Sequence, residues 1–339
     1  MSNQKYLDEF EEILKTWTET EIGRKSFLAS VPILLASCAA TGGDKGRYRE
    51  GDNKGQETKM TVQDEEKLTA EVLPEMRKDY PPINDSELQS YISSLGEKIV
   101  RTNNLDGKPY KYNFTVVGVN YVNAFALPAG TVYVTAPLIA MAETESELAG
   151  VVGHEVGHIQ ARHTAERMEA EKKEQGKLIM LAGGGGILGG LLGLGAGIAI
   201  CPPKDNACLA KAAGAGALAG AAGGFLIHKY KFMANSRENE MEADRIGFKT
   251  SYNAGFSKAH IGKFYEKLLN MEKEAKKGSN PMLASLSDAF STHPPSQERV
   301  NQMNQMVAEA KNNNGIVSSV EFDRAKKLSQ DWIAANRKS

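Results

Sequence analysis

The sequence His154-Glu155-Val156-Gly157-His158 is the feature that most restricts what this chain can fold into. Two histidines four residues apart on a helix point the same way and can hold one zinc ion. The glutamate between them can reach a water molecule on that metal. The chain has six histidines in 339 residues, so chance would produce this pattern in roughly one chain in a hundred. The pattern predicts a helix with a zinc site, provided that a third ligand lies elsewhere.

The sequence around this motif has the pattern of a partly buried helix. Residues 138–177 read as helical sequence. Within this range, Glu145 and Glu147 lie at the start of the helix that carries the motif, and acidic residues stabilise the N-terminal end of a helix. His163 lies beyond His158 at a spacing that a continuous helix would turn to another side. We therefore interpret His163 as a structural or surface histidine. Apolar residues at helical spacing predict the buried face of the motif helix: Leu148, Val151, Val152, Val156 and Ile159.

The best candidate for the third ligand lies in residues 236–244. Glu240 and Asp244 are spaced to share one face of a helix. Glu240 could bind the metal, while Asp244 could orient a histidine ring through its N–H group. The alternative is a solvated charged helix, which the charge pattern alone favours.

Strand signals precede the metal motif. Residues 110–119 alternate as a strand, and residues 131–135 read as another. Residues 123–130 lie between them and end in a turn signal. An edge strand beside a zinc site could hold an extended peptide by main-chain hydrogen bonds. The strand signals alone favour the alternative, a hairpin that only completes a small sheet. Residues 62–104 read as helical, with a break at Pro81-Pro82.

Four motifs in order resemble those of the M48 zinc metallopeptidases over roughly residues 65–305. They are the His154–His158 motif, the Ser-Arg-x-x-Glu-x-x-Ala-Asp stretch at 236–244, Asn123-Ala-Phe-Ala-Leu-Pro and Thr292-His293-Pro294. The resemblance implies an α+β fold, a mainly helical zincin-like metallopeptidase domain with a small β-sheet beside the motif helix. An export signal and tether, described below, favour the periplasmic lipoprotein-like BepA/LoiP branch.

The resemblance also implies roles for individual residues. His154, His158 and Glu240 match the ligands of one Zn²⁺ ion, and Glu155 matches the general base. Asp244 matches a supporting residue of the site. His293 matches a histidine on a loop near the metal that is implicated in regulating or completing the site. Asn123, Ala124 and Phe125 match the strand that lines the substrate cleft. Arg299 matches the arginine of the family's His-Pro…Arg pattern.

The N-terminal residues have the pattern of an export signal. A basic pair, Arg24-Lys25, precedes an apolar run at 27–36 and then Ser37-Cys38. Leu35-Ala36-Ser37-Cys38 resembles a bacterial lipobox. The pattern predicts an export signal at 1–38, a lipidated Cys38 and a flexible tether at 39–61. The expected location is the bacterial cell envelope, as a periplasmic lipoprotein anchored in the outer membrane. The alternative is a cytosolic protein with a short buried helix.

A Gly/Ala-rich segment, residues 178–227, interrupts the predicted peptidase domain at 62–305. We expect an antiparallel helical hairpin rather than two membrane spans, because its glycines make poor membrane helices. Cys201 and Cys208 lie at its tip and could form a disulfide in an oxidising periplasm. A helical C-terminal extension is expected at 306–339.

Charge and motifs together favour a peptidase. The formal net charge is −1, which gives no indication of nucleic-acid binding. The first hypothesis is a zinc endopeptidase that acts on misfolded or envelope proteins, with Glu155 as general base and proteins or peptides as substrates. The second is a chaperone-like quality-control protein with a latent metal site, in which His293 occupies the open zinc position. A third is an integral membrane protease.

Overall fold

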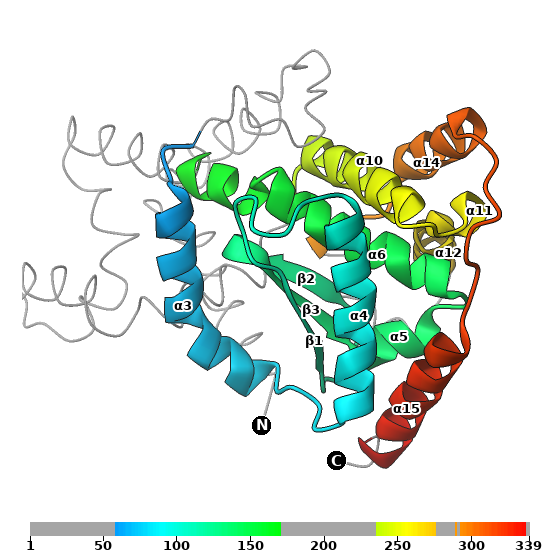
Figure 1. Ribbon diagram of the computed structural model, residues 1–339, viewed down its shortest axis with the longest axis horizontal. Helices are drawn as coiled ribbons and strands as arrows, with labels where there is room; N and C mark the ends of the chain where they lie inside the picture. Colours follow the sequence, from blue (N-terminus) through cyan, green and yellow to red (C-terminus); the bar gives the residue numbers. More distant parts are fainter. Residues whose placement is uncertain (1–57, 171–234, 276–288, 290–291, 337–339) are drawn as a thin grey trace, which may run out of the picture. The chain divides into compact units, whose positions relative to one another are not determined.

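The computed structural model describes residues 58–170, 235–275, 289 and 292–336 (Figure 1). Several predicted features lie outside these residues: the export signal with Cys38, most of the tether, the Gly/Ala-rich segment at 178–227, and Cys201 and Cys208. Within the described ranges, no helix is both long and apolar enough to cross a membrane.

The first two helices of the described residues confirm the helical prediction for residues 62–104. Helix α3 (Val62–Asp79) begins at Thr61, whose side chain accepts a hydrogen bond from the Asp64 N–H in a capping box. Helix α4 (Ser86–Thr102) begins at Asp85, whose carboxylate accepts hydrogen bonds from two backbone N–H groups of the first turn. The predicted break at Pro81-Pro82 therefore separates two well-capped helices.

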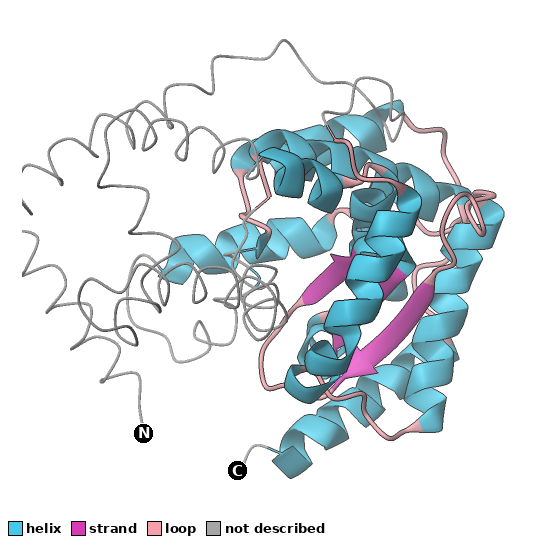
Figure 2. Ribbon diagram, turned by 90° about the vertical axis from the view of Figure 1, so that its left-hand side faces the viewer, coloured by secondary structure: helices cyan, strands magenta, loops and turns pink. Residues whose placement is uncertain are grey.

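A small sheet lies among the helices (Figure 2). It contains β1 (Asn113–Val117), β2 (Ala124–Leu127) and β3 (Thr131–Thr135), in the order β1-β3-β2. Strand β3 pairs parallel with β1 and antiparallel with β2, and the short η1 (Pro128–Gly130) joins β2 to β3. Strand β2 is therefore an edge strand among the described residues. This arrangement confirms the α+β, mainly helical fold class.

The alternating residues of the sheet face two groups of helices. On one face, Val132 and Val134 join the core that α4 and the motif helix share. On the other face, Tyr133 and Leu127 pack against the buried side of α3. Because side chains alternate along a strand, both faces of this small sheet are covered by helices.

Two helices pack closely and carry most of the site: α6 (Glu145–Gln160) and α10 (Arg237–Asn253). Their backbones approach at glycines. A Cβ atom on Gly247 would lie 2.6 Å from the backbone N of His154, and one on Gly153 would lie 2.5 Å from Ser251 Oγ. Both distances are too short for real side chains. The glycines thus permit the close approach that brings the α6 histidines to the α10 carboxylates.

The remaining helices support this pair. Helices α11 (Lys258–Ile261) and α12 (Lys263–Ala275) pack on α6, and α14 (Gln297–Glu309) packs on α10 and α12. Helix α15 (Val320–Asn336) packs on α4 and on α5 (Ala136–Met141). The C-terminal helix is therefore attached to the same core as the site.

Candidate metal centre

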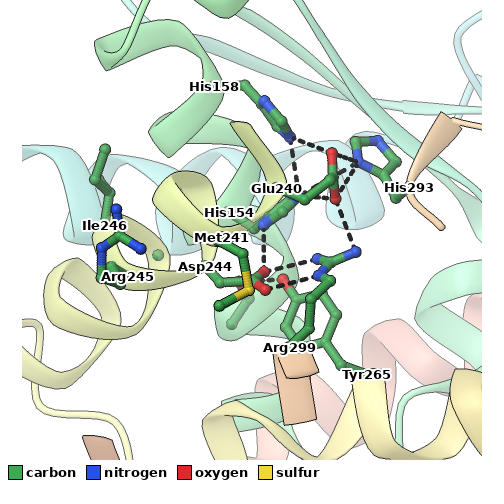
Figure 3. Close-up of polar contacts among 12 residues, drawn as sticks. His154, His158, Glu240, Met241, Asp244, Arg245, Ile246, Tyr265, His293 and Arg299 are labelled. Carbon is green, nitrogen blue, oxygen red and sulfur yellow. Dashed lines mark hydrogen bonds and ion pairs between the residues drawn. The ribbon is translucent and has the colours of Figure 1, made fainter. Parts of the chain in front are cut away.

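Helices α6 and α10 bring the three predicted ligands into one cluster (Figure 3). The Nε2 atoms of His154 and His158 are 2.9 Å apart. The Glu240 carboxylate bridges them, with Oε2 3.3 Å from His154 Nε2 and Oε1 3.2 Å from His158 Nε2. All three side chains are buried. The i, i+4 spacing puts both histidines on one face of α6, and the close packing of α10 on α6 brings Glu240 to them.

His293 is the fourth member of the cluster. It lies on the loop before α14, and its Nδ1 is 3.1 Å from Glu240 Oε1 and 3.3 Å from His154 Nε2. One ligand atom from each of the four residues lies within 4.8 Å of the others. The loop histidine thus occupies a position comparable to that of the three predicted ligands.

The arrangement of these atoms fits a small tetrahedral metal ion. Metal–ligand bonds of about 2.0–2.1 Å in a tetrahedron place neighbouring donor atoms about 3.3 Å apart. The five contacts given above measure 2.9–3.3 Å, and the four ligand atoms together lie within 4.8 Å of one another. Imidazole nitrogens and a carboxylate oxygen are also the donors that zinc accepts. The residues present therefore suit a metal of this kind.

Arg299 holds the two carboxylates of α10 in place. Its Nη1 is 2.7 Å from Glu240 Oε2, and its Nε and Nη2 each lie 2.7 Å from an Asp244 oxygen. The guanidinium also lies 4.8 Å from the centre of the Tyr265 ring. Asp244 Oδ1 in turn lies 2.9 Å from His154 Nδ1. Asp244 thus occupies the position, predicted from its spacing, from which it can orient a ligand ring.

The electrostatic environment keeps both carboxylates ionised. Burial alone would raise the pKa of Glu240, but His293 and Arg299 outweigh it and hold that pKa well below the usual value. Burial would also raise the pKa of Asp244, but the positive charge of Arg299 outweighs burial and lowers that pKa. The centre therefore presents an anionic oxygen ligand before any metal binds.

The two ligand histidines differ in charge. Burial opposes the charged form of His154, yet Glu240 and Asp244 raise its pKa to about 9. Burial, together with repulsion from His154, lowers the pKa of His158 well below its ordinary value. Because metals bind the neutral ring, ion binding must displace the proton of His154.

Glu155 lies beside the cluster without belonging to it. Its Oε1 is 3.6 Å from His293 Nε2. Its Oε2 is buried and, among the described residues, has no hydrogen-bond partner. Such an orphaned buried carboxylate oxygen is uncommon in folded proteins, and a catalytic role is one of its physical explanations.

A cleft leads to this carboxylate. Its wall includes Glu155, His158 and His293, together with Asn123 and Phe125 from the β2 region. The side chain of Ala124 instead packs into the core on the other face of β2. Of the three predicted substrate-binding residues, Asn123 and Phe125 thus line the cleft, whereas Ala124 belongs to the core.

The prediction that His163 points away from the site was wrong. His163 is fully buried, and its Nδ1 lies 2.8 Å from Nδ1 of His158. Helix α6 ends at Gln160, and Arg162 adopts a positive φ of 54° before helical structure resumes. This left-handed residue breaks the continuous helix that was assumed. The sequence carries no glycine or asparagine there that would have indicated the turn.

Other residues of the site also escaped the sequence reasoning. Tyr265, on α12, is buried under Arg299 and has its ring 5.5 Å from that of His154. Asn235, Thr164 and Arg167 also line the cleft. No regular sequence spacing relates these residues to His154, so their place in the site follows only from the folded structure.

Comparisons with known proteins agree with this geometry. The model of peptidase family M48 matches residues 86–307. The beta-barrel assembly-enhancing protease of Escherichia coli (strain K12) is 31% identical over 243 residues, which cover 70% of this chain and 44% of that protein. The mitochondrial metalloendopeptidase OMA1 of Saccharomyces cerevisiae is 28% identical over 188 residues, covering 56% of this chain and 44% of that protein.

A third relative is the metalloprotease LoiP of Escherichia coli (strain K12). It is 27% identical over 197 residues, covering 58% of this chain and 62% of that protein. The chain spans less than half of the length of the first two relatives. The family resemblance of the four motifs is nevertheless confirmed over most of the chain. The chain belongs to peptidase family M48, whose relatives here include metalloproteases of the predicted BepA/LoiP branch.

Proposed function

We propose that this protein is a zinc-dependent endopeptidase with Glu155 as its general base. The observation that carries the proposal is the convergence of three histidines and Glu240 beside the orphaned Glu155 carboxylate in a cleft. Membership of family M48 supports a metalloprotease activity. Comparing casein degradation by the wild-type chain and by Glu155→Gln protein tests the proposal.

The residues of the centre have separable roles in this proposal. Zinc bound by His154, His158 and Glu240 would polarise the scissile carbonyl and lower the pKa of the attacking water. Glu155 takes a proton from that water and later delivers it to the leaving amine. Arg299 keeps the Glu240 ligand ionised, and Asp244 orients the ring of His154. His293 lines the same cleft as Glu155, which makes it the candidate donor to the developing oxyanion once substrate is bound.

An extended protein segment is the substrate that the cleft suits best. Strand β2 has an outer edge without a strand partner among the described residues, and Asn123 and Phe125 line the cleft beside it. Main-chain hydrogen bonds to such an edge bind any extended segment with little regard to its sequence. We infer misfolded or incompletely assembled envelope proteins as substrates, in keeping with the name of the β-barrel assembly-enhancing relative.

The same proposal places the protein in the bacterial cell envelope, as a periplasmic lipoprotein of the outer membrane. The support is the lipobox pattern ending at Cys38. In a bacterial host, the mature chain is expected to begin at an acylated Cys38, and Cys38→Ala should prevent both cleavage and acylation. Mass spectrometry of the N-terminal peptide measures this. Cys201→Ala, a matched cysteine change elsewhere, should be processed normally. Recovery of an intact N-terminus beginning at Met1 from wild-type cells would contradict lipidation.

A second candidate function is a latent protease whose site His293 closes. The supporting observation is that His293 Nδ1 lies within 3.3 Å of both Glu240 and His154, where a fourth ligand would be. A protein held in this state would act mainly by binding misfolded chains through the cleft. Opening the loop would then convert it into a peptidase.

The substitution His293→Ala separates the two roles of this loop histidine. If His293 blocks the fourth position, the variant should cleave casein several times faster than wild type, because the competent state is no longer a minor population. Initial rates at saturating zinc measure the effect. His260→Ala, which changes a histidine away from the cleft, should leave the rate unchanged. A loss of cleavage in His293→Ala protein would instead assign His293 to the reaction itself.

A further inference from the structure

His163 and Glu242 extend from the metal centre as a chain of buried polar contacts. His163 Nδ1 is 2.8 Å from His158 Nδ1, and His163 Nε2 is 3.3 Å from Glu242 Oε2. The side chains of His163 and Glu242 are 0% and 2% exposed. Contacts so deeply buried are expected to be matched donor–acceptor pairs.

The position of the protons follows from the chemistry of the two rings. His158 directs Nε2 toward Glu240 and His154, so as a metal ligand it must carry its proton on Nδ1. Two facing Nδ1 atoms can share only one hydrogen. His158 Nδ1–H therefore donates to His163 Nδ1, and the His163 proton must be on Nε2, from which it donates to the Glu242 carboxylate. Each contact then has one donor and one acceptor.

The fold fixes His163 in this orientation from outside the centre. Arg162, at φ 54°, turns the chain so that His163 points back to the end of α6. Its guanidinium is held by Glu65 of α3, with Nε 3.2 Å and Nη2 3.1 Å from Oε2. Nη2 also donates to the carbonyl oxygen of Met60 at 2.6 Å. A backbone conformation that costs free energy is maintained here by a partly buried ion pair.

We propose that His163 is a positioning residue for the metal centre, which holds His158 in its metal-binding tautomer and is itself held by Glu242. The proposal rests on the zinc-peptidase function, since it assigns the support of one ligand of that site. In this proposal, each of the two ligand histidines is supported by a carboxylate of α10. Asp244 Oδ1 lies directly at His154, 2.9 Å from Nδ1, whereas the Glu242 carboxylate reaches His158 only through an intervening histidine.

Two substitutions of His163 distinguish positioning from packing. Asn places an amide oxygen near the site of the imidazole Nδ1 and so keeps an acceptor for His158. Leu fills the buried volume better than Asn but has no acceptor. We expect His163→Leu to weaken zinc binding by about 10- to 100-fold, as losses of such outer partners do. His163→Asn should retain most of the wild-type affinity. A structural role alone would produce the reverse order.

The measurement is zinc affinity of the full-length proteins by competition with a chromophoric chelator, with the visible spectrum of the cobalt-substituted forms as a second readout. His260→Leu is the matched control, because His260 contacts Ser257 Oγ rather than the centre, and it should bind zinc like wild type. Equal affinity in the wild-type, His163→Leu and His163→Asn proteins would overturn the inference while leaving the peptidase proposal intact. Absence of zinc binding by the wild-type protein would instead defeat the proposed function.

The histidine tautomers provide a test that does not depend on how the variants fold. In wild-type protein labelled with ¹⁵N-histidine and loaded with zinc, long-range ¹H–¹⁵N spectra report which ring nitrogen carries each proton. We expect His163 to be neutral with its proton on Nε2, and His158 to carry its proton on Nδ1. A proton on Nδ1 of His163 would overturn the proposed relay.

Discussion

Glu155→Gln protein is expected to bind zinc as wild type does and to cleave casein at least about 100-fold more slowly, since a positioned general base contributes about 10²–10⁴ in rate. Glutamine keeps the shape of the side chain but cannot accept the proton of the attacking water. Glu155 lies beside the cluster of His154, His158, Glu240 and His293 and is not a member of it, so metal binding should survive.

Two measurements on the same preparation decide this prediction: zinc content by elemental analysis and the initial rate of casein degradation. Glu97→Gln is a suitable control, because Glu97 is a half-exposed side chain paired with Arg101 on α4. That variant should behave as wild type in both assays. Wild-type rates of proteolysis from pure Glu155→Gln protein would refute the assignment of the base. Loss of zinc from that variant would instead make Glu155 a ligand.

The second large effect is expected on stability, from Arg299→Met. Arg299 is buried and pairs with both Glu240 and Asp244, which are buried as well. Removing it leaves two carboxylates in the interior without their cation, and breaking a buried ion pair in this way costs about 3–5 kcal/mol. Methionine has a similar length, so packing over the Tyr265 ring should be largely kept.

Chemical denaturation of the metal-free proteins measures this change in the free energy of unfolding. The metal-free form is used because bound zinc would replace part of the lost positive charge. Arg237→Met is the matched control: Arg237 pairs with Glu298 on the surface, and loss of an exposed pair should leave the unfolding midpoint nearly unchanged. An Arg299→Met midpoint equal to that of wild type would show that the buried carboxylates do not depend on this arginine.

Much of the fold and of the metal cluster could be predicted because the relevant signals are local. The spacing of His154 and His158, and that of Glu240 and Asp244, directly reports which side chains share a helix face. The helical pattern of residues 62–104 and the strand pattern of residues 131–135 are likewise encoded in a few neighbouring residues. These features follow from backbone geometry and need no knowledge of distant contacts.

The cluster residue on the loop was harder to assign. His293 precedes two prolines and has no periodic relation to the motif helix, so its role came only from the family resemblance. Its Nδ1 lies 3.1 Å from Glu240 because α14 packs on α10 and carries the loop to that position. Packing between helices, which local sequence does not report, decides such a contact.

The sequence by itself determined one half of the centre, a pair of histidines and a glutamate on one helix, and offered a carboxylate pair on another helix as the candidate third ligand and its support. Only the tertiary structure decided how that centre is supported. The close approach at Gly247, the arginine clamp of Arg299 and the turn at Arg162 that returns His163 to His158 all depend on contacts between distant segments. The physical reason is that helical periodicity is set by the backbone of each segment alone. A left-handed residue or a buried charge, in contrast, is stable only when another part of the chain provides the compensating contacts.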